Sequence, residues 1–167
     1  RDDRPCPEGK DAREYYRSVL ADKTGVLVAT AARYGAMFGG CSPEVVAIAT
    51  EYGERLGVAF QLADDLIDIA SVSGETGKTP GTDLREGKRT LPVLNALASD
   101  DPGDEELQTL LLSDLRDDAS LARALQLLRP HPAMVEAREE TLAVGQGAKD
   151  VLAPLPDSDA KNALLAL

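Results

Sequence analysis

Apolar residues recur along this chain at the three- and four-residue spacing of helices, and the alternation typical of strands is absent. The spacing predicts a helix over about 11–38, ended by Gly39 and Gly40. A second helix is predicted to start after Ser42, with Pro43 at its first position, and to run to about residue 70. We therefore expect an all-α fold, with residues 1–167 forming a single all-α unit.

Residues 71–89 form a long connection that is rich in glycine, serine, threonine and charge. Long connections inside compact domains are often functional. Thr90 can cap the next helix. Pro92 is compatible with that helix, because proline is tolerated in a first helical turn. Further short helices are predicted over about 104–113, 117–129 and 132–152, with a last helical piece after Pro154 and Pro156.

The composition excludes several classes of function. The net charge of -11, from 29 acidic and 18 basic residues, argues against a nucleic-acid partner. The single histidine, His131, lies between two prolines, so we expect no histidine-based metal cluster or catalytic triad. Cys6 and Cys41 make no disulfide framework, which favours a reducing, cytoplasmic compartment. No apolar run approaches ~18 residues, so stable membrane insertion is not expected.

An aspartate cluster at the end of the second predicted helix is the most informative feature. Asp64 and Asp68 are four residues apart and share a helix face with Gly57 and Gln61, whereas Asp65 lies one step around the helix. Like charges at this spacing repel, acidic groups oppose the dipole at a helix C-terminus, and the apolar flanks suggest partial burial. A bound hard cation such as Mg²⁺ would offset all three costs. The alternative is a solvated acidic helix end.

The connection that follows brings lysines and glycines together. Lys78, Lys88 and Arg89 are interspersed with Gly77, Gly81 and Gly87. Glycines let the backbone approach an anion, and lysines act as point charges for phosphate, although a solvated linker has the same composition. Beside a metal-binding cluster the two features explain each other: carboxylates hold metal, metal holds diphosphate, and lysines neutralise the rest. A cation between carboxylates and phosphate also reconciles an acidic protein with an anionic ligand.

The first predicted helix contains Lys23 and Thr24 in its middle, followed by Gly25, which lowers helix propensity. A series of small residues follows. It indicates either close helix–helix packing or a slot for an apolar ligand tail; its members are Ala29, Ala32, Gly35, Ala36 and Gly39.

Three segments, 21–25, 57–68 and 77–88, followed by Leu91-Pro92, resemble the trans-isoprenyl diphosphate synthases of the polyprenyl synthetase family. The resemblance runs in order and at family spacing from Tyr15 to Leu97. Residues 64–68 resemble the family's second aspartate-rich motif. The resemblance implies the C-terminal portion of an isoprenoid synthase-type helical bundle. It also implies Mg²⁺-dependent condensation of isopentenyl diphosphate with an allylic prenyl diphosphate, in which three Mg²⁺ help the allylic diphosphate to leave.

The resemblance also implies residue roles. Asp64 would ligate Mg²⁺ directly, Asp65 and Asp68 would act mainly through metal-bound water, and Asp83 would support the water shell. The same three motif aspartates, together with Lys23, would be the catalytic residues. The remaining residues would serve the substrates: Lys23, Thr24, Gln61 and Lys78 on the allylic diphosphate, Lys88 as added positive charge, and Phe60 beside the isopentenyl group.

One departure from the family is the absence of its first aspartate-rich motif, which precedes all the segments above. We therefore expect the chain to be the C-terminal half of a larger domain, to need an N-terminal half for catalysis, and to form a homodimer as the family commonly does. Two alternatives stay open: a non-catalytic subunit or inactive remnant of the same fold, and a terpene cyclase. Cyclases usually carry an Asn/Ser/Glu metal motif on this helix, and the sequence from Asp64 to Asp68 argues against one.

Overall fold

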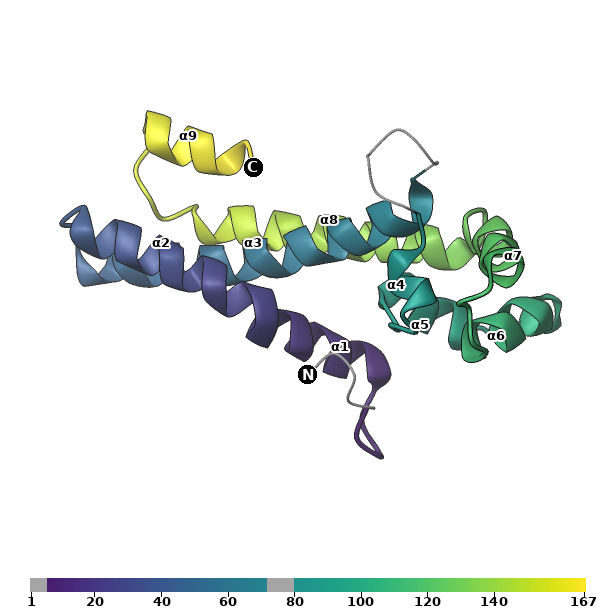
Figure 1. Cartoon of the computed structure of the whole chain (residues 1–167). Helices are drawn as coiled ribbons and strands as arrows, with labels where there is room; N and C mark the ends of the chain where they lie inside the picture. The colour runs from purple at the N-terminus through teal and green to yellow at the C-terminus, as the bar shows by residue number, and fades with distance from the viewer. Residues whose placement is uncertain (1–5, 72–79) are drawn as a thin grey trace. The chain divides into compact units, whose positions relative to one another are not determined.

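The computed structural model describes residues 6–71 and 80–167, and every regular element within these ranges is helical. The α-helices are α1 (Ala12–Leu20), α2 (Val26–Phe38), α3 (Pro43–Ala70), α4 (Thr82–Arg85), α5 (Leu91–Leu97), α6 (Glu105–Leu112), α7 (Asp118–Leu128), α8 (Pro132–Val151) and α9 (Asp159–Leu165). A π-helix, Ala21–Gly25, joins α1 to α2, and a 3-10 helix, Pro102–Asp104, precedes α6. The predicted all-α class is confirmed (Figure 1).

The chain divides into two compact units, each made of two stretches of sequence. Unit 1 contains residues 1–16 and 62–140, and unit 2 contains residues 17–61 and 141–167. Helices α3 and α8 contribute residues to both units. The prediction of a single all-α unit within a larger domain stays a prediction.

Polar side chains set the helix starts largely where the sequence predicts them. The Asp11 carboxylate accepts hydrogen bonds from the backbone N–H groups of Arg13 and Glu14, at 2.9 and 3.0 Å, and so caps α1. The Ser42 hydroxyl accepts from the N–H of Val45 at 3.4 Å and begins α3 as expected. The predicted continuous helix over 11–38 is interrupted by the π-helix. A glycine follows Thr24 there, and Gly25 packs against Glu54 and Val58.

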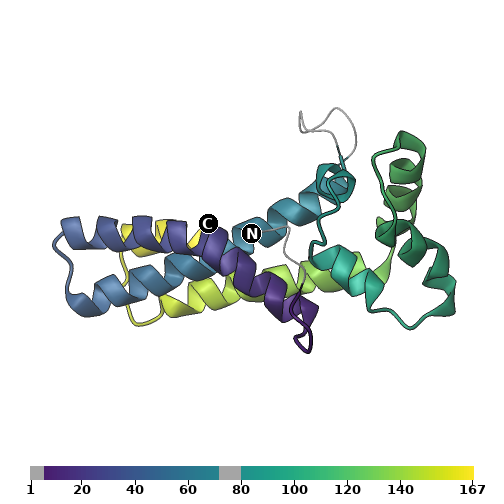
Figure 2. The same ribbon diagram turned by 60° about the horizontal axis from the view of Figure 1, so that its bottom comes forward.

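In unit 2, α2 runs alongside the first part of α3, as Figures 1 and 2 both show. Glycines of α3 make this approach close: a Cβ added at Gly53 would lie 2.8 Å from the Val28 carbonyl oxygen and 3.0 Å from the Ala32 Cβ. Ala29 is buried in the same contact. Close packing, the first interpretation of the small-residue series, is therefore confirmed at Ala29 and Ala32, whereas Gly35 has open space beside it.

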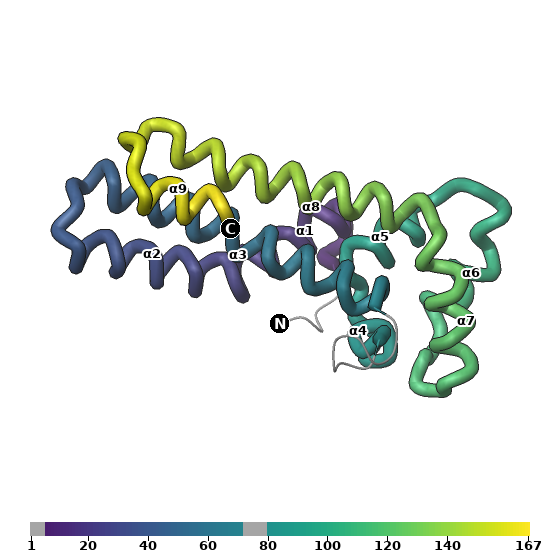
Figure 3. Tube along the Cα trace, turned by 90° about the horizontal axis from the view of Figure 1, so that it is seen from above, coloured from purple at the N-terminus to yellow at the C-terminus, as the bar shows by residue number. Residues whose placement is uncertain are grey.

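The C-terminal helix α9 folds back beside the first part of α3 (Figure 3). The buried Tyr52 hydroxyl donates a hydrogen bond to the Leu164 carbonyl oxygen at 2.8 Å. Tyr52 forms a core cluster with Ala148 and Leu152 of α8. This cluster holds together both sequence stretches of unit 2.

The core of unit 1 is formed by buried leucines and alanines from short helices. Its members are Ile69, Leu84, Val93, Ala96, Leu107, Leu111, Leu115, Leu121, Ala124, Leu125, Leu128 and Ala133. The end of α3 is anchored to this core through Ile69. The aspartate motif is therefore tied to the hydrophobic core of unit 1. In the described residues, no helix is long and apolar enough to cross a membrane.

Candidate functional site

The last turns of α3 carry the three motif aspartates on two different faces. Asp65 is only 2% exposed and lies in the buried stripe with Leu62 and Ile69, each 1% exposed. Asp64 and Asp68 are half-buried. The helix therefore directs one carboxylate into the core of unit 1 and leaves two accessible.

The Asp68 carboxylate binds the start of α4 across the connection. Its Oδ1 accepts from the N–H of Thr82 at 3.1 Å, and its Oδ2 accepts from the N–H of Asp83 at 3.1 Å. The Asp68 carbonyl oxygen also accepts from the N–H of Gly81 at 2.9 Å. Because the residue before α4 is a glycine without a side-chain cap, Asp68 supplies the cap from a different helix.

Gly81 is required at this junction for two reasons. Its φ of 74° lies in the left-handed region, which favours glycine. A Cβ at this position would also lie 3.0 Å from Leu125 Cδ1 and 3.2 Å from Leu121 Cδ1. The glycine therefore lets α4 begin beside Asp68 while packing closely against α7.

The electrostatics around Asp68 favour a cation. Burial raises the pKa of the Asp68 carboxyl above its ordinary value, and the negative charges of Asp83 and Asp64 raise it further, against the lowering effect of the two backbone hydrogen bonds. Within the described ranges, no group of three or more histidine, cysteine, aspartate or glutamate side chains could hold a metal ion. Mg²⁺, however, is usually held by only one or two carboxylates together with waters and substrate phosphates. The accessible carboxylates therefore fit a cation that is shared with a phosphate ligand.

Asp83 and Lys88 are brought together directly. The Lys88 ammonium lies 2.9 Å from Asp83 Oδ1 and 2.8 Å from Glu86 Oε2. The pKa of Lys88 is raised above its ordinary value. The hydrogen bond to Glu86 has the largest effect, and the hydrogen bond to Asp83 has the next largest. Lys88 therefore stays fully charged while two carboxylates balance it.

Three of the residues that we expect to contact diphosphate belong to unit 2: Lys23, Thr24 and Gln61. Lys23 and Thr24 lie in the π-helix rather than in a regular helix, a local geometry that is frequent at functional sites. The Thr24 hydroxyl lies 3.2 Å from the Gln61 side-chain oxygen and donates to it. A Cβ at Gly57 would lie 2.9 Å from the Gly25 Cα, so the π-helix approaches α3 closely here. The side chain of Phe60 is exposed.

Lys78 lies outside the described residues. The expected metal set is thus placed in unit 1 with Lys88, whereas Lys23, Thr24, Phe60 and Gln61 are placed in unit 2. The roles of these residues stay predictions. Neither the Asp68 cap nor the contact of the Tyr16 hydroxyl, which lies 2.5 Å from Asp65 Oδ2, could be predicted from the sequence, because both depend on tertiary packing.

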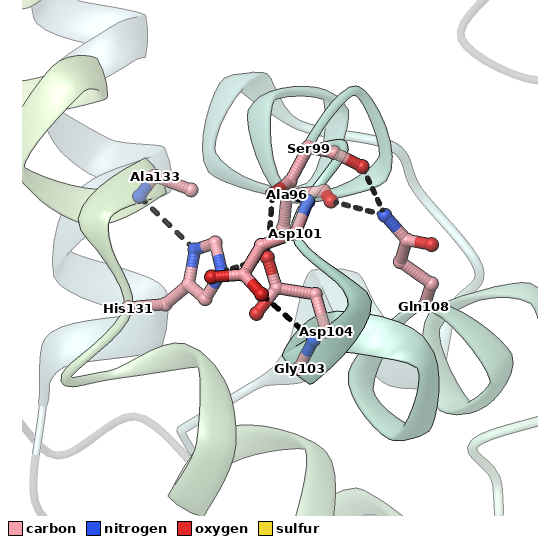
Figure 4. Close-up of polar contacts among 8 residues, drawn as sticks. All are labelled: Ala96, Ser99, Asp101, Gly103, Asp104, Gln108, His131 and Ala133. Carbon is pink, nitrogen blue, oxygen red and sulfur yellow. Dashed lines mark hydrogen bonds and ion pairs between the residues drawn. The ribbon is translucent and has the colours of Figure 1, made fainter.

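A second polar cluster in unit 1 contains a serine, an aspartate and the histidine (Figure 4). The Ser99 hydroxyl donates to Asp104 Oδ2 at 2.5 Å, and His131 Nε2 lies 2.9 Å from the same oxygen. His131 Nδ1 accepts from the N–H of Ala133 at 3.1 Å, so the proton of the neutral ring lies on Nε2. A cavity of about 200 Å³ adjoins these residues and Asn95.

This arrangement differs from a nucleophilic triad. In a triad the histidine accepts the serine proton and the carboxylate orients the histidine. Here the serine donates to the carboxylate, and neither imidazole nitrogen is available to accept its proton. The cluster joins the end of α5, the 3-10 helix and the start of α8, and we assign it a structural role.

Comparisons with known proteins give a consistent result. The family model described as "Polyprenyl synthetase" matches residues 5–128. The nonaprenyl diphosphate synthase of Mycobacterium tuberculosis is 44% identical over 167 residues, which is 100% of this chain and 50% of that protein. The octaprenyl diphosphate synthase of Escherichia coli is 32% identical over 92% of this chain and 48% of its own length. The chain therefore spans about half the length of the curated relatives that it matches.

Solved structures agree with the sequence matches. The geranylgeranyl pyrophosphate synthase of Corynebacterium glutamicum, complexed with calcium and isoprenyl diphosphate, superimposes with a TM-score of 0.86 at 42% identity. The match covers 96% of this chain and 50% of that one. The polyprenyl synthase of Caulobacter crescentus, in a complex with the same two ligands, gives a TM-score of 0.83 at 32% identity over 92% of this chain and 47% of that one.

Proposed function

Because the chain belongs to the polyprenyl synthetase family, we propose that it supplies the C-terminal half of a trans-prenyl diphosphate synthase. The reaction is the condensation of isopentenyl diphosphate with an allylic prenyl diphosphate, which lengthens an isoprenoid chain. The relatives named above make products of different length, so the proposal concerns the reaction class.

The observation that carries the proposal is the group of accessible carboxylates at the end of α3 and the start of α4. Burial and the charges of Asp64 and Asp83 raise the pKa of Asp68, because a negative charge on Asp68 is disfavoured there, and a bound cation would relieve that cost. Two of the solved relatives are complexes with a divalent cation and an isoprenyl diphosphate. We propose that Asp64, Asp68 and Asp83 bind Mg²⁺ in this chain, and we consider Asp65 separately below.

When bound, Mg²⁺ would stabilise the negative charge of the departing diphosphate, as metal ions do at phosphoryl oxygens. The protein's own groups have complementary tasks. Asp68 keeps α4 capped and so holds Asp83 beside the end of α3. We propose that Lys23, Thr24, Gln61 and Lys78 bind diphosphate oxygens, that Lys88 adds positive charge, and that Phe60 packs against the isopentenyl group.

We also propose that an N-terminal half completes the domain, that the complete enzyme is a homodimer, and that it works in the cytoplasm. The first of these proposals is supported by the matches, which cover about half of each relative. A non-catalytic subunit of the same fold would have no need of Mg²⁺-dependent diphosphate binding.

The test is a hybrid enzyme. This chain would replace the matching half of the Corynebacterium glutamicum synthase, to which it is 42% identical. Incubation with isopentenyl diphosphate and farnesyl diphosphate should give products that grow by five carbons, detected by mass spectrometry, with Mg²⁺ and not with chelator. A folded hybrid that binds Mg²⁺ and diphosphate but forms no longer product would contradict the catalytic proposal.

A further inference from the structure

Asp65 differs from its two motif partners in being inside the protein. Among the described residues it is the one charged side chain in the buried class, at 2% exposed. It shares its helix face with Leu62 and Ile69, which are also buried. An ionised carboxylate in such a place is costly unless a hydrogen-bond donor or a counter-charge faces it.

Tyr16 of α1 supplies such a donor within unit 1. Its hydroxyl lies 2.5 Å from Asp65 Oδ2, although the two residues are 49 positions apart in the sequence. Hydrogen bonds from hydroxyls to carboxylates at 2.5–2.7 Å are among the strong ones. Tyr16 and Asp65 each make at least one further interaction besides this hydrogen bond.

We propose that Tyr16 is a positioning residue and that Asp65 is its anchor rather than a metal ligand. Asp65 is one residue after Asp64 and three before Asp68, so fixing its direction fixes the rotation of this part of α3. With Asp65 turned into the core, Asp64 and Asp68 are left half-buried, and Asp68 faces the start of α4. The inference rests on the proposed function, because it concerns how the metal-binding carboxylates are presented.

Other contacts hold the same end of α3 and agree with this role. Arg129 donates from Nε to the Ile69 carbonyl oxygen at 2.9 Å and from a terminal nitrogen to the Ser71 carbonyl oxygen at 2.6 Å. A cation at a helix C-terminus also offsets the dipole that the aspartates oppose. We infer that Arg129 fixes the position of the end of α3, and that Tyr16 fixes the rotation of α3 about its own axis.

The test uses Mn²⁺ as the metal probe, because bound Mn²⁺ has a characteristic electron paramagnetic resonance signal. Mn²⁺ would be titrated into the 167-residue chain in the presence of inorganic diphosphate. We expect Tyr16→Phe to weaken the Mn²⁺ affinity about tenfold, as is typical when a group that orients metal ligands is removed. Asp64→Asn should weaken it at least as much.

Tyr52→Phe is the matched control, because Tyr52 is also a tyrosine whose hydroxyl makes one buried hydrogen bond, to Leu164 of unit 2. It should lower the melting temperature and leave the Mn²⁺ affinity within about twofold of the wild type. Equal affinity losses in Tyr16→Phe and Tyr52→Phe would reduce Tyr16 to an ordinary structural contact. Unchanged affinity in Tyr16→Phe, with loss in Asp64→Asn, would overturn the inference and leave the proposed function standing.

A second variant keeps the test decisive should Tyr16→Phe fail to fold. Asp65→Asn retains an oxygen that can accept from Tyr16 and removes the charge that a ligand would need. We expect it to bind Mn²⁺ within about threefold of the wild type. A loss as large as that of Asp64→Asn would make Asp65 a ligand and overturn the inference, whereas a wild-type chain that binds no Mn²⁺ at all would contradict the proposed function itself.

Discussion

Asp68 and Asp104 are both half-buried aspartates of unit 1 that join separate elements, yet their electrostatic surroundings are opposite. Asp68 has two other carboxylates as neighbours, Asp64 and Asp83, and its pKa is raised, first by burial and then by their charge. Asp104 has the Ser99 hydroxyl and His131 as neighbours, and their hydrogen bonds lower its pKa. Both carboxylates accept hydrogen bonds, and Asp68 is in addition crowded by like charge.

The difference separates a binding site from a structural joint. The side chains that shift the pKa of Asp104 are a serine and a histidine, so removal of this carboxylate should affect folding alone. A carboxylate crowded by others is destabilising until a cation arrives, which is typical of sites kept for binding. The cluster that contains serine and histidine looks more like an active site by residue type, but its carboxylate already has the Ser99 hydroxyl and His131 as partners.

The largest effect should come from Asp64→Asn. We expect it to reduce Mg²⁺-dependent affinity for inorganic diphosphate by about a hundredfold, the upper range for disturbed metal sites, as measured by isothermal titration calorimetry. Asp104→Asn is the control, since it should lower the melting temperature and leave diphosphate binding unchanged. Loss of diphosphate binding in Asp104→Asn would remove the distinction between the two regions.

The next effect concerns the glycine that lets α4 begin beside Asp68. Gly81→Ala should lower the free energy of unfolding by about 2 to 3 kcal/mol, because it combines a left-handed backbone with an overpacked Cβ. Gly87→Ala is a matched control with the same φ of 74° and no atom within 4 Å of its added Cβ. Gly87→Ala should lower the free energy of unfolding, measured with urea, by only about 1 kcal/mol. Equal losses in Gly81→Ala and Gly87→Ala would show that the contact of Gly81 with α7 is unimportant.

The pH dependence of stability should have opposite signs at the two aspartates. The lowered pKa of Asp104 means that its contribution is present above the ordinary value of 3.8 and is lost as the pH falls through its folded pKa. The raised pKa of Asp68 means that the folded state binds the proton more tightly, so stability falls as the pH rises through the range just above 3.8.

Urea unfolding of the wild type, Asp68→Asn and Asp104→Asn from pH 3 to 7, without Mg²⁺, measures both slopes. The difference between wild type and Asp104→Asn should shrink as the pH falls. The difference between wild type and Asp68→Asn should move in favour of the wild type as the pH falls, on top of a constant cost for the altered cap of α4. Slopes of the same sign would break the comparison.

The smallest effect on stability should come from Lys88→Met. The ion pairs of Lys88 with Asp83 and Glu86 are partly exposed. Such pairs contribute about 0 to 1 kcal/mol to the free energy of unfolding. Arg123→Met removes a similar surface pair with Glu106, far from α4 in sequence, and serves as the control. Only Lys88→Met should also weaken diphosphate binding, and equal binding in the two variants would exclude Lys88 from the site.

Local signals in the sequence predict much of this architecture. Ser42 and Pro43 start α3 where expected, and the i,i+4 spacing of Asp64 and Asp68 leaves both accessible. The sequence predicts that Asp65 lies off the face of Asp64 and Asp68, whereas its burial with Leu62 and Ile69 is seen only in the structure. The predicted features depend on residues within one or two helical turns, which is why periodicity recovers them.

The remaining features depend on contacts between distant residues. Asp68 caps α4 by binding Thr82 and Asp83, which are 14 and 15 residues later in the sequence. Tyr16 contacts Asp65, which is 49 residues later. The π-helix around Lys23 arises where Gly25 packs against α3, a contact that helix propensity alone does not reveal. In each case tertiary packing determines the contact.

The central claim is that the accessible carboxylates of α3 and α4 bind a divalent cation together with a diphosphate. The most direct measurement is the calorimetric titration of inorganic diphosphate into the wild-type chain, first with Mg²⁺ and then with chelator. We predict saturable binding with Mg²⁺ and none with chelator. Binding of the same strength under both conditions, or no binding under either, would contradict the claim.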